Sequence, residues 1–564
     1  MERLLFKGLA AVMRRSKIKF LRQVEEAPSV QEQFLRSLLH RHQSTAFGQE
    51  YGLADIQTID QFRERLPVQS YSGFRSYTQR MSMGEPNVLT ADPLIYFNIS
   101  SGSTGEKKLI PVTQRSRQAL ANASRTSIGF AADAALRNGR PLGKMLFPLS
   151  SNSLGHTPSG IPYAPVSTSD LRLTNPLLRQ VFTYPFEVFQ ISDTAARTYM
   201  CLLFALRNAS LRIISATFPV SALQMCNYLE CHAEEMIQDL ETGEIAQGLK
   251  LEPELRAKFE RQCSAVPARA AQLRHQMNQH GRLTPHLAWP DLSFMITARG
   301  GTSNFYFERF PEYFGDLPIF GGVYACAEGT MGVHQDFNTD AAILSIESGF
   351  YEFIPEDQWE VDNPKTVLPW EVTVGDRYRI VLTNYAGFYR YDLGDVVEIA
   401  GFVGQAPTII FRHRRGGVMS SSTEKTTEFQ VIQVMQILQK TFQLALENFC
   451  ITLSKDCIPS HYLVNIELAP GAVLPDPETF LQRFDDTLKD VSAFYAIKRR
   501  DQIPLPRLRI LEPGSFEHLR QRMVQQGIAE SQLKFPHVTE DRNFLDGLSV
   551  QHEARLAGDR LPQL

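Results

Sequence analysis

Apolar residues recur three or four positions apart in several long stretches of the chain, which is the spacing of an amphipathic helix. This pattern predicts helices at residues 30–45, 192–208 and 221–242. Shorter apolar runs, bounded by polar and turn-forming residues, predict strands at residues 94–99, 109–113 and 211–216. Because helices and strands alternate through most of the first 330 residues, we expect α/β layers around a largely parallel sheet.

The pattern changes at about residue 343. From there to residue 411, short strand-like runs alternate with Gly, Asn, Asp and Pro, which predicts an antiparallel, β-barrel-like layer. Residues 414–429 then contain a Gly-Gly pair and three consecutive serines, a composition typical of a hinge. Beyond it the pattern predicts a small α+β unit, with helices and strands at 429–447, 460–468, 477–491, 507–511 and 515–527.

These elements predict an α/β protein with two domains. The larger, residues 1–415, has β-sheets flanked by helices and the barrel-like layer. The smaller, residues 416–564, is expected to be a mobile α+β lid connected by a hinge at about 414–428.

Composition narrows the possible function classes. The 564 residues have a net charge of −3, which gives no support for nucleic-acid binding. The seven cysteines are scattered without a CxxC pair, so neither a disulfide framework nor a zinc site is expected and a cytoplasmic location is favoured. No run of about 18 apolar residues exists, so stable membrane insertion is not expected. The basic, amphipathic residues 1–27 predict a helix packed on the domain, or else one that touches a membrane.

A loop rich in hydroxyl groups separates two of the predicted strands. Residues 100–105 read SSGSTG, and Lys107 and Lys108 follow. Hydroxyl groups and unobstructed backbone N–H groups bind phosphate oxygens, and the lysines add positive charge. Walker and dinucleotide loops lead into a helix, whereas a strand follows here, so neither motif fits. The alternative is a polar turn of a β-hairpin.

Two further stretches contain carboxylates suited to nucleotide chemistry. In residues 321–332, Glu328 follows a predicted strand end, and one or two carboxylates commonly hold a Mg²⁺ that is shared with phosphates. Tyr324 precedes it and could lay its ring along a base. In residues 387–399, Asp395 stands in a Gly-Asp pair before an apolar strand, where a carboxylate can accept both hydroxyl groups of a ribose. Ordinary turns are the alternative at both places.

Taken in order, the hydroxyl-rich loop, Tyr-x-x-x-Glu, Gly-Asp, the hinge and the small last domain resemble the plan of the adenylate-forming enzymes. More closely, the chain resembles the acyl acid amido synthetases, known in plants as the auxin-responsive Gretchen Hagen Three family. The similar blocks cover nearly the whole chain: FGQEYGL (47–53), LPVQSYSGF (66–74), SSGSTG (100–105), IPVT (110–113), DLETG (239–243), WPDL (289–292), VYACAEG (323–329), FYRYDLGDVV (388–397), EKTTE (424–428), SFEHL (515–519) and LKFP (533–536).

The chain also departs from the plant pattern. YACAEG differs from the plant-like Tyr-Ala-Ser-Ser-Glu, and the hinge has glycines and serines where plant members have an apolar strand. These differences indicate a bacterial or otherwise divergent member, so the plant substrates are not carried over.

The resemblance implies that residues 1–415 form an adenylation domain that holds ATP and an acyl substrate, and it implies a role for each matching residue. ATP or AMP would be bound by Ser100, Ser101, Gly102, Ser103, Thr104, Gly105, Gly301, Thr302, Tyr324, Ala325, Asp395, Arg414 and Lys425. Glu328 would hold Mg²⁺ and take part in catalysis, and Lys534 would reach the α-phosphate from the small domain. Val323 would contact the acyl group, in a pocket lined from about residues 118–130, 155–170 and 210–220. For Lys534 the alternative is an ordinary surface charge.

The resemblance also implies a two-step reaction. A carboxylic acid reacts with ATP to give acyl-AMP and pyrophosphate, and an amine, expected to be an amino acid, then takes the acyl group. No GxSxG motif is present, so we expect no covalent enzyme intermediate. The alternatives are transfer of the acyl group to coenzyme A or another thiol, and a non-catalytic nucleotide-binding protein. The expected partners are small molecules, the expected state is a monomer, and neither nucleic acid nor a membrane is a predicted partner.

Overall fold

The computed structural model describes residues 2–101, 107–149, 155–164, 166, 179–301, 303–415, 417–422, 424, 426–500, 502–525 and 533–559. Contacts divide the chain into two compact units, Met1–Phe411 (unit 1) and Arg412–Leu564 (unit 2). The sequence placed its boundary between residues 415 and 416, and the roles it assigned to the two parts stay predictions. Among the described residues, no helix is both long enough and apolar enough to cross a bilayer.

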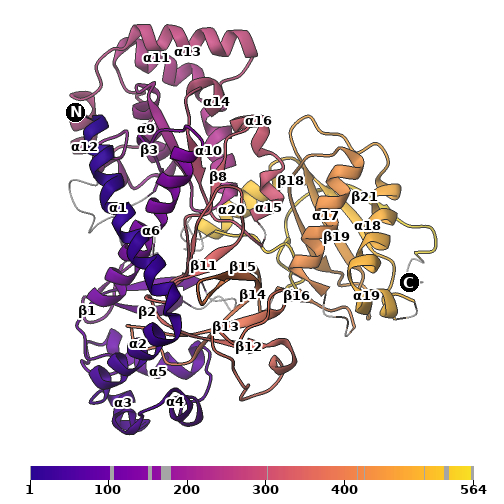
Figure 1. Cartoon of the computed structure of the whole chain (residues 1–564). Helices are drawn as coiled ribbons and strands as arrows, with labels where there is room; N and C mark the ends of the chain where they lie inside the picture. Colours follow the sequence, from indigo (N-terminus) through magenta and orange to yellow (C-terminus); the bar gives the residue numbers. More distant parts are fainter. Residues whose placement is uncertain are drawn as a thin grey trace. The chain divides into compact units, whose positions relative to one another are not determined.

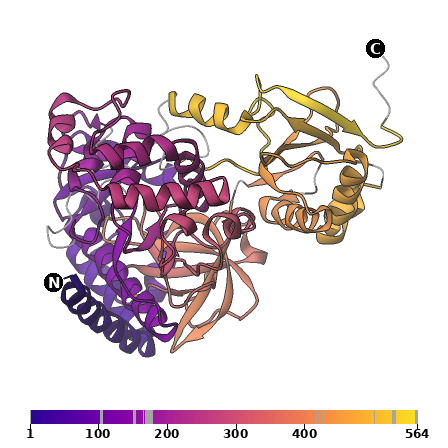
Figure 2. The same ribbon diagram turned by 90° about the horizontal axis from the view of Figure 1, so that it is seen from above.

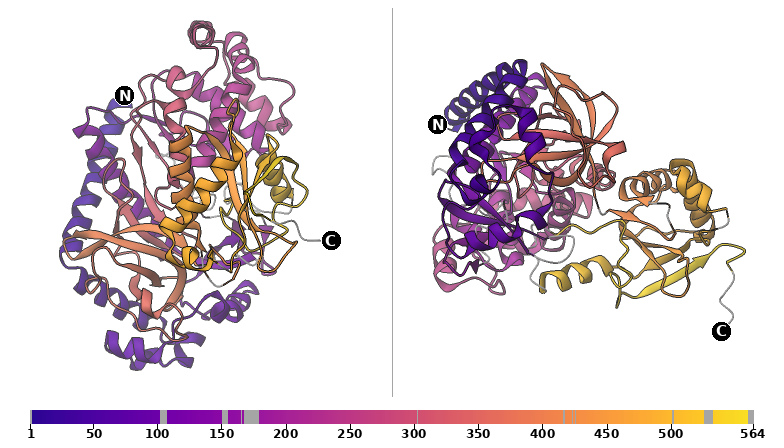
Figure 3. Two further views of the ribbon diagram at one scale, coloured as in Figure 1. Left: turned by 90° about the vertical axis from the view of Figure 1, so that its right-hand side faces the viewer. Right: turned by 90° about the horizontal axis from the view of Figure 1, so that it is seen from below.

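Two long helices lie side by side in unit 1 (Figures 1 and 3). They are α1 (Glu2–Glu25) and α6 (Gln114–Arg137). Gly129 of α6 lets the two backbones come close, because a Cβ built there would lie 2.5 Å from the carbonyl oxygen of Met13. The prediction that the first helix packs on the domain is therefore confirmed.

The remaining helices of unit 1 are short to medium in length. Pro285, Pro253, Pro267 and Pro219 each start one, since proline fits the first helical turn. The helices are α2 (Ala27–His42), α3 (Ala46–Glu50), η1 (Leu53–Asp55), α4 (Ile59–Arg65), α5 (Tyr71–Ser82), η2 (Phe186–Gln190), α9 (Thr194–Leu206), α10 (Pro219–Cys231), α11 (Ala233–Thr242), α12 (Pro253–Glu260), α13 (Pro267–His280), α14 (Pro285–Ala288), α15 (Ser303–Phe307), α16 (Phe310–Phe314) and η3 (Glu356–Gln358).

Two four-stranded sheets belong to the first part of unit 1. The sheet β3-β6-β7-β8 is parallel throughout, as predicted, whereas in the sheet β2-β1-β5-β4 only β1 and β5 are parallel. The strands are β1 (Leu94–Ser101), β2 (Lys107–Thr113), β3 (Lys144–Leu146), β4 (Gly155–His156), β5 (Pro162–Ala164), β6 (Leu211–Ser215), β7 (Phe294–Ile296) and β8 (Ile319–Phe320).

The antiparallel layer predicted after residue 343 is a seven-stranded sheet with the order β12-β13-β14-β15-β11-β10-β9. It begins earlier than predicted, because β9 and β10 come from the motif around residue 328. Its inner side chains join helices α2, α4 and α5 in one hydrophobic core. The strands are β9 (Val323–Ala325), β10 (Thr330–His334), β11 (Ala342–Leu344), β12 (Phe350–Pro355), β13 (Arg377–Thr383), β14 (Tyr391–Val403) and β15 (Ala406–Arg414).

Unit 2 has a four-stranded sheet with the order β18-β19-β20-β21, and helices α17 and α18 lie side by side against it (Figure 2). Its elements are β16 (Val418–Met419), β17 (Thr426–Thr427), α17 (Glu428–Phe442), β18 (Leu446–Leu453), β19 (Tyr462–Leu468), α18 (Pro477–Val491), α19 (Ala493–Lys498), β20 (Arg507–Leu511), α20 (Ser515–Gln525) and β21 (Val550–Arg555).

Two helix predictions were wrong in extent or continuity. The helix predicted at 429–447 stops at Phe442, because Gln443 adopts a left-handed conformation (φ 49°) and its N–H bonds carbonyl groups of the last turn. The chain then forms β18, which the sequence did not predict. The helix predicted at 221–242 is divided at His232 into α10 and α11.

Candidate active site

The hydroxyl-rich loop joins the antiparallel strands β1 and β2. Ser100 pairs with Lys108 and Ser101 with Lys107, so the strand predicted after the loop is confirmed. Residues 102–106, with Gly102, Ser103, Thr104 and Gly105, lie outside the described residues, as do the side chains of Ser100 and Ser101. The ammonium group of Lys108 lies 5.6 Å from the centre of the Tyr71 ring.

An asparagine near the end of β1 connects this hairpin to the motif around residue 328. The Nδ2 of Asn98 donates a hydrogen bond of 3.2 Å to the carbonyl oxygen of Ala327, and the side chain is buried. Sequence reasoning missed Asn98, although a polar amide inside an apolar strand is a signal that it needs a partner. The bond brings the base of the predicted phosphate loop next to Glu328.

Tyr324 and Asp395, identified from separate motifs, are hydrogen-bonded to each other. The hydroxyl of Tyr324 in β9 donates to Oδ2 of Asp395 in β14 at 2.8 Å. The Tyr324 ring also lies 5.7 Å from the ring of Phe411 on β15, and the two rings are tilted by 59°. Asp395 is buried, so its carboxylate stands in a fixed orientation beside an aromatic pair.

Glu328 is also buried and is held from two sides. The hydroxyl of Tyr391 donates to its Oε1 at 3.1 Å, and Nδ2 of Asn384 donates to its carbonyl oxygen at 2.6 Å. Asn384 is itself fixed, because its Oδ1 accepts from the backbone N–H groups of Ala386 and Phe388. A carboxylate has room for about four hydrogen bonds or ligand contacts, so one tyrosine leaves capacity for a cation. The donor set therefore fits Mg²⁺.

The start of β14 is fixed by a buried ion pair that the sequence did not reveal. Arg390 has φ 47°, and its Nε and Nη2 bond the carboxylate of Glu352, with a shortest distance of 2.9 Å. Its Nη1 donates to the carbonyl oxygen of Leu66 at 2.6 Å. Both ionic side chains are buried, and such a pair is costly to break from one side. Tyr391, which bonds Glu328, is the next residue.

A backbone bridge ties the same point to residue 69. The N–H of Gln69 donates to the carbonyl oxygen of Arg390 at 3.1 Å, and the N–H of Asp392 donates to that of Gln69 at 2.8 Å. Residue 69 thus pairs with Tyr391 as a short parallel bridge. The LPVQSYSGF block, given no role from sequence, supports the strand that carries Asp395.

The glycines before α15 lie against β15. The N–H of Gly301 donates to the carbonyl oxygen of Phe411 at 2.9 Å, and a Cβ on Gly300 would lie 2.9 Å from that oxygen. Only glycine permits this approach with the positive φ angles found at both positions. Thr302 lies outside the described residues.

Three of the predicted residues belong to unit 2. Arg414 is exposed, and its carbonyl oxygen accepts from the N–H of Gly417 at 3.0 Å. Lys534 is exposed between two buried residues, and Lys425 lies outside the described residues. The roles assigned to these residues stay predictions.

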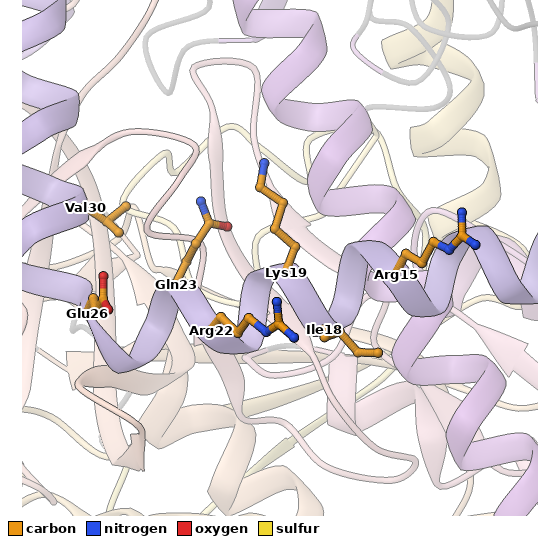
Figure 4. Close-up of a pocket in the computed structure, with 7 residues that line it drawn as sticks. All are labelled: Arg15, Ile18, Lys19, Arg22, Gln23, Glu26 and Val30. Atoms are coloured by element: carbon orange, nitrogen blue, oxygen red, sulfur yellow. The ribbon is translucent and has the colours of Figure 1, made fainter.

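Ala325 and Val323 flank Tyr324 on β9. Ala325 is exposed, and Val323 is half-buried and packs against the hydrophobic core. A hollow of about 400 Å³ lies elsewhere, along α1, where Arg15, Lys19 and Arg22 border it together with Val30 of α2 (Figure 4). Because none of the predicted acyl-contacting residues borders it, we do not assign the acyl group to this hollow.

Comparisons with known proteins show that most of the chain matches one family. Family models match in three successive segments: the GH3 family N-terminal domain at residues 17–319, the central domain at 342–414 and the C-terminal domain at 429–543. The indole-3-acetic acid-amido synthetase GH3.4 of Arabidopsis thaliana is 26% identical over 92% of this chain and 90% of that protein. The jasmonoyl–L-amino acid synthetase JAR4 of Nicotiana attenuata is 25% identical over 92% of each.

A solved structure is similar over almost the whole chain. The acyl acid amido synthetase AtGH3.15 in complex with 2,4-DB superposes with a TM-score of 0.85 and is 23% identical. The superposition covers 96% of this chain and 97% of that one. This likeness confirms the predicted α/β fold class.

Proposed function

Since this chain belongs to the GH3 family, we propose that it is an ATP-dependent acyl acid amido synthetase, a ligase that joins a carboxylic acid to an amine through an acyl-adenylate. The family membership predicted from the motifs is confirmed, and the proposed reaction is the one that the relatives' names state. One observation in the structure supports the proposal most directly. Tyr324 and Asp395 come from separate motifs and form one hydrogen-bonded pair.

The nucleotide is proposed to lie against this pair. A Tyr324 ring beside Phe411 offers an aromatic surface for adenine, and the Asp395 carboxylate, an acceptor group, is proposed to bind the ribose hydroxyl groups. The phosphates are assigned to residues 100–105, with Gly301, Thr302 and Ala325 lining the nucleotide and Arg414 and Lys425 completing its contacts. Asn98 supports this assignment, because it joins the strand before the loop to the Glu328 segment.

Glu328 is proposed to hold Mg²⁺, which would neutralise part of the phosphate charge when an anionic acid approaches. The protein supplies the orientation of the carboxylate through Tyr391 and Asn384. Because Glu328 is buried, its charge requires a cation or a donor nearby. Tyr391 provides the donor.

The chemistry follows from bringing two anions together. A carboxylate oxygen of the acid bonds to the α-phosphorus of ATP, and the bond to pyrophosphate breaks. The ammonium group of Lys534 is proposed to stabilise the charge that develops on the α-phosphate. An amine then attacks the acyl carbonyl, AMP leaves, and the amine loses a proton. Burial raises the pKa of the Cys201, Cys226, Cys263 and Cys450 thiols, which disfavours thiolate catalysis at these four positions.

The partners proposed are a small carboxylic acid and an amino acid or other amine. Apolar residues in the predicted acyl-binding ranges, such as Phe130, Ile213 and Phe218, favour an aromatic or aliphatic acid. Val323 is proposed to touch its acyl group. We also propose that the protein acts in the cytoplasm as a monomer.

A screen of the products tests the proposal. Pyrophosphate release is measured over a panel of aromatic and aliphatic acids with ATP and Mg²⁺, and active acids are then incubated with mixed amino acids or with coenzyme A. We expect an amide by mass spectrometry and AMP in equal amount. A thioester product without any amide would show that coenzyme A, and not an amine, is the acceptor. ATP binding without pyrophosphate release for every acid would contradict an enzyme of this class.

A further inference from the structure

The residue proposed to act on the α-phosphate stands in a firmly anchored segment. Leu533 and Phe535, on either side of exposed Lys534, are both buried in one hydrophobic cluster with Phe516 of α20. The rings of Phe535 and Phe516 lie 5.5 Å apart. The backbone on both sides of Lys534 is therefore tied to the core of unit 2, and only the lysine side chain projects outward.

A buried histidine three residues later adds a second anchor. His537 stacks on Phe449 of β18, with ring centres 4.2 Å apart and an angle of 11°. Its Nδ1 donates to the carbonyl oxygen of Phe449 at 2.9 Å. The backbone also pairs with β18, because the N–H groups of Ile451 and Thr539 bond the carbonyl oxygens of His537 and Ile451.

The backbone N–H of His537 is hydrogen-bonded to a carboxylate. Oε1 of Glu428, the first residue of α17, accepts from it at 2.7 Å, and both residues are buried. The backbone N–H of Glu428 in turn donates to the carbonyl oxygen of Gly417 at 2.7 Å. One glutamate thus contacts both the predicted hinge and the segment that carries Lys534.

The other glutamate of the EKTTE block also binds backbone N–H groups. The carboxylate of Glu424 is buried and accepts from Ser421 at 2.6 Å and from Ser422 at 2.9 Å. The hydroxyl of Tyr462 on β19 donates to it at 2.5 Å. Glu424 therefore ties the serine run of the hinge to the sheet, and Glu428 ties the start of α17 to His537. The sequence had assigned a role to Lys425 of the EKTTE block but none to its two glutamates.

We propose that Glu428 is a positioning residue for adenylation, holding the 533–539 segment through the His537 N–H so that Lys534 is presented at a fixed place. The inference rests on the proposed function, which gives Lys534 its role. A misplacement of about 1 Å can cost a rate factor of roughly 100. A hydrogen bond to a charged acceptor is stronger than a neutral one, so a carboxylate at this point limits movement of the segment. Burial lowers the pKa of His537, although the neighbouring Glu428 charge acts in the opposite direction.

Four variants, two of them at Glu428, separate positioning from folding. Glu428→Ala removes the acceptor, whereas Glu428→Gln retains an oxygen for the His537 N–H and is expected to restore much of the rate. Glu478→Ala is the matched control, because Glu478 is an exposed first-turn glutamate of α18 and contributes the same charge to a helix N-terminus. Lys534→Ala measures how far the adenylation rate falls when the lysine itself is absent.

The readouts are the two half-reactions and amide exchange. With the acid that releases pyrophosphate fastest, Glu428→Ala is expected to lower the adenylation kcat about 10- to 100-fold with little change in the KM for ATP. Conversion of a synthetic acyl-adenylate to amide should fall less. Hydrogen exchange of the 533–539 amides should become faster in Glu428→Ala and remain unchanged in Glu478→Ala.

The outcomes distinguish this inference from the proposed function. A wild-type adenylation rate in Glu428→Ala, beside a slow Lys534→Ala, would overturn the role of Glu428 alone. A wild-type rate in Lys534→Ala would overturn both the role of Lys534 and this inference. Unchanged amide exchange at 533–539 in Glu428→Ala would likewise contradict it, whatever the acid. Equal losses of adenylation rate in Glu428→Ala and Glu478→Ala would show that Glu428 contributes only a negative charge at a helix N-terminus.

Discussion

The hydroxyl of Tyr324 and the carboxylate of Asp395 form a hydrogen bond of 2.8 Å between residues 71 positions apart in the chain. The bond engages Oδ2 of the carboxylate and directs the plane of the group. An aspartate that only capped a turn would bond neighbouring backbone groups. Asp395 bonds a tyrosine on another strand, as expected for a ligand that must keep one orientation.

Removing this carboxylate is expected to weaken ATP selectively. Asp395→Ala should raise the KM for ATP roughly 10- to 100-fold, because each hydrogen bond to a charged group contributes about 1.5–3 kcal/mol. Binding of inorganic triphosphate, which has no ribose, should not change. Initial rates measure the KM for ATP, and isothermal titration compares the binding of ATP with that of triphosphate. An unchanged KM for ATP would leave Asp395 with a structural role only.

Tyr324→Phe tests the orientation of the carboxylate separately from its presence. The ring that faces Phe411 remains, but the donor to Asp395 is lost. We expect a smaller rise in the KM for ATP than for Asp395→Ala, about threefold to tenfold. Because the two residues act together, the double variant should lose no more than Asp395→Ala alone. Fully additive losses would show that the two side chains contact the nucleotide independently.

Tyr391 and Glu328 are expected to govern the response to Mg²⁺. Tyr391→Phe removes the donor that orients Oε1 of Glu328, so the Mg²⁺ concentration needed for half-maximal pyrophosphate release should rise. Loss of a residue that hydrogen-bonds a metal ligand costs about 10- to 100-fold in metal affinity. Glu328→Gln should lower the rate at every Mg²⁺ concentration. Wild-type Mg²⁺ dependence in both variants would place the metal elsewhere.

The loop after β1 is expected to bind the phosphates. Ser101→Ala combined with Thr104→Ala should weaken ATP by about 1.5–3 kcal/mol for each lost hydrogen bond to a charged oxygen. The backbone pairing of β1 with β2 does not depend on these hydroxyl groups, so thermal unfolding should be unaffected. Titration with ATP measures the affinity, and unchanged binding would contradict the assignment.

The buried residue His42 is expected to make stability depend on pH. Its Nδ1 accepts from the N–H of Ala91 at 2.9 Å, and burial lowers its pKa from 6.5 to about 4. Between those values the unfolded chain takes up a proton that the folded chain does not, so stability falls as the pH falls. From pH 6.5 to about pH 5 the loss should be about 2 kcal/mol.

Urea unfolding at neutral pH and at about pH 5 measures this loss. His42→Asn keeps an acceptor for the Ala91 N–H but does not titrate, so its stability should fall by less over the same range. Other histidines, including His334, are buried with a lowered pKa and contribute to both proteins equally. Parallel pH curves for the wild type and His42→Asn would show that His42 is not responsible.

Much of the architecture could be predicted because the responsible signals are local. The apolar runs at 94–99 and 211–216 are strands β1 and β6, and the helix predicted at 192–208 is α9, whose first turn bonds the Asp193 side chain. Strand β18 was missed because its residues continue the apolar pattern of α17. The left-handed Gln443 that separates them is not a glycine, so nothing in the composition marked it.

The site was predicted as separate motifs but not as an assembly. Each motif identified Tyr324, Glu328 or Asp395 from its immediate neighbours, whereas the bonds of Tyr324 to Asp395 and of Tyr391 to Glu328 join distant strands. The same holds for Arg390, whose partners are Glu352 and the carbonyl group of Leu66. Such contacts depend on the register of seven strands, which periodicity along the chain does not encode.

The bridge between residue 69 and β14 has a consequence for recombination among relatives. A crossover between residues 69 and 391 would combine a Gln69 segment from one parent with a β14 from another. The two backbone hydrogen bonds that join Gln69 to Arg390 and Asp392 would then form only if the two parents have compatible backbones at this point. The matched family segments 17–319 and 342–414 are therefore poor units of exchange. A crossover between Phe411 and Arg412 leaves both bonds within one parent. Chimeras that fold should therefore arise more readily by replacing everything after that point than by shuffling within the sequence before it.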